Sequence, residues 1–154
     1  MKGRGIRQAK AQSGVAMVEF AVALPLLLLL LLAVAEFGRM LYHYNSLMQA
    51  SRDASRFVAG QAWNRTLGKI VLDEGLKSNA RDVAVYGAPV SSGTPVVPGL
   101  TTDHVSVEQV GTEHVQVRIS YEFQPVIGDG IPAFIGSEVS LSILLVATTV
   151  MRAL

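Results

Sequence analysis

One acidic residue within a long apolar stretch points to a specific chemistry. Glu19 is the only charged residue among residues 15–35. A carboxylate inside a membrane helix costs on the order of a few kcal/mol toward the bilayer centre, so it needs a partner or a role. Val15 and Glu19 are four residues apart, which places them on one face of a helix. Cleavage after Gly14 would create an α-amine on Val15, an ionic partner for this carboxylate. In a second interpretation, Glu19 is solvated at headgroup depth.

The remaining residues form no pattern typical of catalysis or metal binding. The sequence has no cysteine, which excludes disulfides, thiolate metal sites and thiol catalysis. The three histidines (His43, His104 and His114) lack the spacing of metal ligands, and we interpret His43 as a surface residue. The net charge is +1 with no basic cluster beyond the first ten residues, so nucleic acid is not an expected partner. We expect no enzymatic activity, no metal and no cofactor.

The apolar stretch is long enough to cross a membrane. As a helix, residues 15–35 would extend roughly 30 Å, which matches the hydrocarbon core of a bilayer. Residues 1–14 contain no acidic residue and four cations, Lys2, Arg4, Arg7 and Lys10. The positive-inside bias therefore predicts a cytoplasmic N-terminus, with the bulk of the chain on the other side of the bilayer. We predict a basic leader in residues 1–14 and a transmembrane helix in residues 15–35.

Three interpretations of this N-terminal segment remain open. The first is an uncleaved signal anchor. The second is a secretory signal peptide cut after Ala33-Val34-Ala35, although the apolar stretch is long for such a peptide and Glu19 would fall in its n-region. The third is a leader cut on the cytoplasmic side of the apolar stretch. That cut requires a small residue at the boundary and an acid just inside it, and Gly14 and Glu19 supply both.

The sequence around this boundary resembles the processing site of type IV-class prepilins. Residues 14–20 read Gly-Val-Ala-Met-Val-Glu-Phe, which is similar to the tight-adherence group. Similarity to the TadE-like family extends over nearly the whole chain, in residues 23–32, 36–39, 50–57 and 83–87. The resemblance implies cleavage between Gly14 and Val15 by a membrane prepilin peptidase. It also implies that Glu19 and Phe20 act in recognition and subunit assembly, with Glu19 contacting the N-terminal amine of a neighbouring subunit.

The same resemblance implies a function for the whole chain. It suggests a bacterial pseudopilin or minor pilin that acts in assembly of a tight-adherence pilus and supports adherence and biofilm formation. Its expected partners are other pilin or pseudopilin subunits, contacted through the N-terminal helix, the inner-membrane assembly machinery and the lipid bilayer. It would be a single-pass inner-membrane protein with a periplasmic C-terminal domain, or extracellular within a pilus. The alternative is a monomeric membrane-anchored periplasmic binding module with an uncleaved signal anchor.

Helical patterning continues beyond the apolar stretch, through residues 36–62. Six residues with 4-3-4-3-4 spacing mark one helix face, and Gly60 is the predicted end of the helix. This stripe consists of Met40, Tyr44, Leu47, Ser51, Ala54 and Val58. We predict a second helix at about residues 66–85, with its apolar face at Leu72, Leu76, Ala80 and Val83.

Residues 63–154 are expected to form a small α+β domain. Strands are predicted at about residues 104–110, 113–123 and 139–151, with a hairpin through Gly111-Thr112. The middle strand alternates apolar and polar residues, and we expect Leu145 and Ile143 to share one face of the last strand with residues 139 and 141. The predicted fold class is therefore α+β and pilin-like, with a long N-terminal helix packed on an antiparallel sheet of about three strands.

Overall fold

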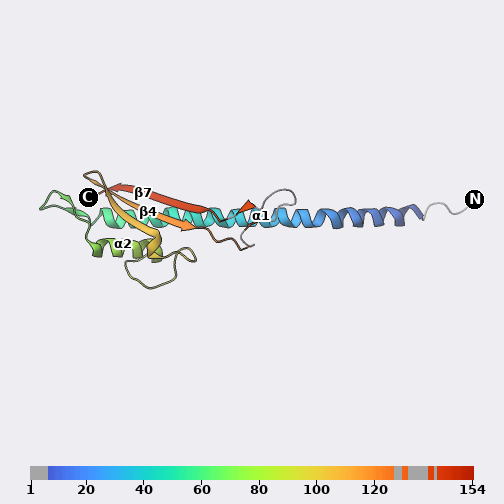
Figure 1. Cartoon of the computed structure of the whole chain (residues 1–154), viewed down its shortest axis with the longest axis horizontal. Coiled ribbons are helices and arrows are strands. Elements are labelled where there is room, and N and C mark those ends of the chain that lie inside the picture. Colours follow the sequence, from blue (N-terminus) through green and yellow to red (C-terminus); the bar gives the residue numbers. More distant parts are fainter. Residues whose placement is uncertain (1–6, 127–129, 132–138, 141) are drawn as a thin grey trace, which may run out of the picture. The chain divides into compact units, whose positions relative to one another are not determined.

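The structure is a computed structural model that describes residues 7–126, 130–131, 139–140 and 142–154 (Figure 1). It divides into two compact units, Met1–Gly38 and Arg39–Leu154. The helices are α1 (Arg7–Ala59) and α2 (Glu74–Tyr86), with a 3-10 turn η1 (Thr102–His104). The strands are β1 (Trp63–Asn64), β2 (Lys69–Ile70), β3 (Val105–Val110), β4 (His114–Glu122), β5 (Gly130–Ile131), β6 (Val139–Ser140) and β7 (Leu144–Arg152). The predicted α+β class, a long N-terminal helix with small antiparallel sheets, is confirmed.

Helix α1 contains Pro25 and ends at Ala59, one residue before the glycine predicted to stop it. Pro25 lacks a backbone N–H, which removes one helical hydrogen bond, yet the segment remains α-helical around it. Within the unit Arg39–Leu154, the part of α1 from residue 39 onward buries Leu47, Ser51, Ala54 and Val58, as the stripe predicted. The prediction was wrong at Tyr44, whose side chain is 39% exposed.

The main sheet has three antiparallel strands in the order β3-β4-β7. The β3–β4 hairpin turns through Gly111, whose φ of 65° lies in the left-handed region that glycine adopts without strain. Strand β4 alternates as predicted, because the side chains of Val115, Val117, Ile119 and Tyr121 are all buried. Within the unit Arg39–Leu154, Figure 1 shows β4 and β7 running alongside the last part of α1.

Two elements differ from their predicted bounds. The second helix begins at Glu74 instead of about residue 66, because residues 63–70 form the β1–β2 hairpin. The Asp73 side chain caps α2 by accepting a hydrogen bond from the Leu76 backbone N–H at 2.7 Å. The last strand is β7, from residue 144, because residues 139–140 pair with β5 in a separate ladder. Ile143 precedes β7 and is 42% exposed, while residue 141 lies outside the described residues.

Small polar residues on α1 face the sheet. The Ser51 hydroxyl lies 3.1 Å from the Val117 carbonyl oxygen of β4 and 3.0 Å from the Thr149 hydroxyl of β7. Val117 and Thr149 are direct partners in the ladder, so Ser51 sits over the junction of the two strands. One hydroxyl has one proton, so the consistent arrangement has Ser51 donating to the carbonyl and accepting from Thr149. Ser55 adds a longer hydrogen bond to the Thr149 carbonyl, at 3.3 Å.

Candidate functional site

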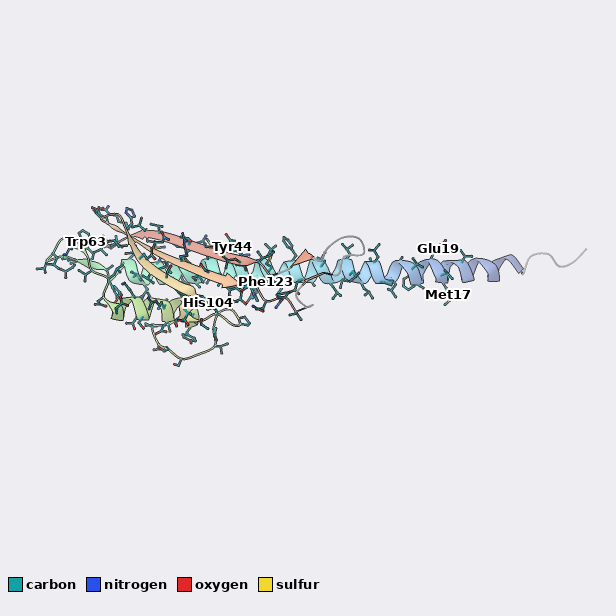
Figure 2. The ribbon with its side chains drawn as sticks, in the orientation of Figure 1. Met17, Glu19, Tyr44, Trp63, His104 and Phe123 are labelled. Carbon is teal, nitrogen blue, oxygen red and sulfur yellow. The ribbon has the colours of Figure 1, made fainter. Side chains whose placement is uncertain are left out.

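The residues predicted at the processing site lie on one continuous helix. Gly14, Val15, Glu19 and Phe20 all belong to α1, which begins at Arg7 in the structure. Val15 is 59% exposed and Phe20 is 61% exposed, and Glu19 is also exposed. Val15 and Glu19 keep the four-residue spacing that puts them on one helix face. Figure 2 shows the Glu19 side chain projecting from α1. All four residues are therefore exposed on α1, with Val15 and Glu19 on one face of the helix.

The glycine at the predicted cleavage boundary has no packing role within the described part of the chain. A Cβ atom added at Gly14 would meet no atom within 4 Å. Its φ is not positive, so its backbone conformation is open to any residue. Packing and backbone geometry therefore both leave the choice of glycine at this position unexplained.

Exposed apolar side chains surround Glu19. An 18-residue window of α1 has a mean hydropathy of 2.7, and none of that window is buried. Leucine side chains between residues 26 and 31 are largely exposed, including Leu26 at 65% and Leu30 at 61%. Water would hydrate such a surface poorly, whereas lipid chains or other apolar helices would cover it. One N-terminal helix of this chain is thus long and apolar enough to span a membrane.

A second cluster of polar and aromatic residues lies in the unit Arg39–Leu154. His43 is buried, with its ring centroid 5.5 Å from that of Phe123 and 6.1 Å from that of Tyr121. Arg39 places its guanidinium carbon 4.7 Å from the centre of the Phe123 ring, and it donates a hydrogen bond to the Gln124 carbonyl. The prediction that His43 is a surface residue was therefore wrong. A signal was present, since His43 precedes Leu47 by four residues and shares its helix face.

Tyr121 connects this cluster to the loop before η1. Its hydroxyl donates a hydrogen bond to the Pro98 carbonyl at 2.9 Å, and its ring also meets that of His104 edge-on. Burial raises the pKa of Tyr121 above its ordinary value, while the nearby Arg39 opposes that rise. A neutral, hydrogen-bonded phenol and a packed imidazole form a structural cluster that holds the end of β4 against α1 and η1.

His104 and His114 are not brought together. His104 lies in η1, whereas His114 begins β4 and pairs with Val110 at the far end of β3. Within the described residues, no group of three or more His, Asp or Glu side chains is arranged to hold a metal ion.

Comparison with known proteins gives one match. No curated protein and no solved structure matches the sequence. The family model described as "TadE-like protein" matches residues 14–56. That range begins at Gly14 and includes Glu19, Phe20 and the part of α1 that carries Arg39 and His43. Residues 83–87, which also resembled the family, lie outside the match. The resemblance to the TadE-like family predicted from the sequence is thus confirmed for residues 14–56 of this chain.

Proposed function

We propose that this chain is a prepilin-type subunit, a pseudopilin or minor pilin, that acts in assembly of a tight-adherence pilus. A prepilin peptidase removes residues 1–14 by cleaving between Gly14 and Val15. The new amine of Val15 and the carboxylate of Glu19 then mark the start of a helix held in the inner membrane. That helix packs with the helices of other subunits, and the domain that follows is periplasmic or, within a fibre, extracellular.

The observation that carries this proposal is the accessible acid on an unburied apolar helix. Glu19 stands within the family match, and exposed apolar side chains such as Val18 and Phe20 flank it on α1. A carboxylate in that setting is costly unless an opposite charge neutralises it. An amine at Val15 of an adjacent subunit supplies that charge, and the adjacent helices cover the apolar surface.

The glycine at residue 14 supports the proposed cleavage. Because nothing within 4 Å restricts a side chain there, the requirement for glycine would come from an outside molecule. Glycine also weakens a helix by about 1 kcal/mol relative to alanine, which makes local unwinding at the scissile bond easier. A peptidase that binds an extended backbone benefits from both properties.

The first test is the N-terminal sequence of the mature protein, recovered from membranes and read by mass spectrometry. The proposal expects a start at Val15. A start at Glu36 would mean a secretory signal peptide, and an intact Met1 would mean an uncleaved anchor. Gly14→Leu should block cleavage without affecting membrane insertion. Gly38→Leu is the matched control, because Gly38 lies in the same helix with equally open surroundings.

Assembly is tested separately from cleavage. Glu19→Ala should abolish pilus assembly while the protein remains in the membrane, because only the charge contact is lost. Val22→Ala is the control, since Val22 is an exposed apolar residue three positions along the same helix. If cells carrying Glu19→Ala build normal pili, the assembly role of this carboxylate is refuted. The monomeric binding module would then be the better description.

A further inference from the structure

A polar cavity lies at the end of the domain where α1 terminates. It has a volume of about 450 Å³ and lies between the β1–β2 hairpin and the first two turns of α2. Trp63, Gln61, Asn64, Asp73 and Asn79 contribute its aromatic and polar lining. All of these residues belong to the unit Arg39–Leu154, and Figure 2 shows Trp63 at this end of the domain.

The hairpin holds the cavity wall in a fixed geometry. Trp63 pairs with Ile70, and the Val71 N–H donates to the Ala62 carbonyl at 2.8 Å. The side-chain oxygen of Asn64 accepts from the backbone N–H groups of Thr66 and Leu67, both at 3.0 Å. These bonds leave the side-chain amide nitrogen of Asn64 available as a donor. The site is pre-formed, which lowers the entropic cost of binding.

The lining offers neutral hydrogen-bonding groups next to one aromatic ring. Within the described chain, the side-chain amide of Asn79 has no hydrogen-bond partner, and Asn79 is exposed on α2. Gln61 makes only a long contact, 3.5 Å, to the Phe57 carbonyl. Amide groups both donate and accept, as sugar hydroxyls do. An indole ring supplies an apolar face suited to the C–H face of a pyranose.

Other ligand classes fit this lining poorly. Among the described residues, no Lys, Arg or His lines the cavity, so an anionic group would find no counter-charge there. The N-terminus of α2 is already capped by Asp73, and Glu74 adds negative charge beside it. Asp73 is the only carboxylate in the described lining, which is too few for a hard cation. A largely polar wall also disfavours an apolar ligand.

We propose that this cavity binds a neutral saccharide unit of a glycan, with Trp63 under the sugar ring and Asn79, Asn64 and Gln61 on its hydroxyls. The inference does not rest on fibre assembly, because the cavity belongs to the unit Arg39–Leu154 and does not involve Glu19. A surface glycan of another cell and a polysaccharide of the bacterial envelope share this chemistry. The disaccharide that binds will distinguish between these sources.

Trp63 is the only tryptophan of the chain, so its emission reports on the cavity without background. The full chain is kept in micelles of a detergent without a sugar headgroup and titrated with lactose, cellobiose and N,N′-diacetylchitobiose. We expect a saturable change in emission with at least one disaccharide, at a Kd of about 1 mM. Saturation-transfer NMR on the same samples detects binding that leaves the emission unchanged.

A pair of neighbouring substitutions gives the decisive comparison. Asn79→Ala should weaken binding about three- to tenfold, the loss expected for one hydrogen bond. Ser78→Ala, on the adjacent exposed position of α2 outside the cavity, should leave binding unchanged. The proposal is overturned if neither method detects binding up to about 10 mM. N-acetylneuraminic acid is titrated alongside as a charged sugar, and the proposal is also overturned if it alone binds. Equal binding by both variants would overturn it as well.

Discussion

Removing the Ser51 hydroxyl tests how much its hydrogen bonds between α1 and the sheet contribute to stability. Ser51 is fully buried, and its two hydrogen bonds reach Val117 on β4 and Thr149 on β7. Each buried hydrogen bond contributes about 0.5–1.5 kcal/mol, so Ser51→Ala should destabilise the domain by about 1–3 kcal/mol. Thr149→Val keeps the side-chain volume and removes one of the two bonds, so it should cost about 0.5–1.5 kcal/mol.

The double variant separates the hydrogen bond from general packing. Ser51→Ala with Thr149→Val leaves neither hydroxyl unpaired, so its cost should be about 1 kcal/mol less than the sum of the single costs. The assay is guanidinium unfolding of the full chain in micelles, followed by the emission of Trp63, with the free energy taken from the midpoint and slope.

A control in the same helix completes the experiment. Ser46 makes a hydrogen bond of similar length, 3.0 Å, to the Tyr42 carbonyl, but at an exposed position. Ser46→Ala should change the free energy of unfolding by less than about 0.5 kcal/mol. If the Ser51 and Thr149 costs add within about 0.3 kcal/mol, the two hydroxyls are not coupled, and the proposed arrangement of their protons is wrong.

Three further predictions concern the domain. Phe123 is 1% exposed, so Phe123→Ala should lower the free energy of unfolding by about 3–5 kcal/mol in the same assay. Because burial raises the pKa of Tyr121, the unfolded state loses this proton first. The stabilising contribution of the protonated Tyr121 side chain is therefore complete below about pH 10, the ordinary pKa of tyrosine. It declines as the pH rises through the pKa of Tyr121 in the folded state. Tyr121→Phe should flatten that decline, and an equal decline in both proteins would contradict the reasoning. Gly87 ends α2 with a φ of 77°, so Gly87→Ala should cost about 1–2 kcal/mol, measured as a shift of the unfolding midpoint.

Regular patterns in the sequence predicted the regular elements. The alternation of apolar and polar residues from Val115 to Tyr121 predicted β4. In a strand with one buried face, every second side chain points toward the core. Gly111 predicted the hairpin, because glycine adopts its φ of 65° without strain. Gly60 predicted the end of α1 to within one residue. Glu19 could be selected because it interrupts a uniform apolar background. Gly14 could be selected because it lies five residues before Glu19, where the basic segment meets the apolar stretch.

Elements too short to produce a periodic pattern could not be predicted as well. The β1–β2 hairpin has two-residue strands, too short to produce a periodic pattern, and its turn depends on the Asn64 side chain. The apolar face that predicted the second helix does not define where the helix begins, and the prediction extended it back over this hairpin. Asp73 followed by Glu74 was a recognisable N-cap signal. The cavity beside Trp63 could not be foreseen, because its wall joins the hairpin to α2 only after folding.

The position of β7 in the sheet determines when the domain can be completed. The β3–β4 hairpin is contiguous in the sequence, but the other edge of β4 pairs only with β7, which starts at Leu144. Until that segment is synthesised, the central strand has an open edge, and Leu145 and Ala147 are missing from the core. A two-stranded hairpin is only marginally stable, so the last strand makes folding cooperative. A β7 segment from another copy could pair with the same edge of β4, which is the geometry that strand exchange between copies requires.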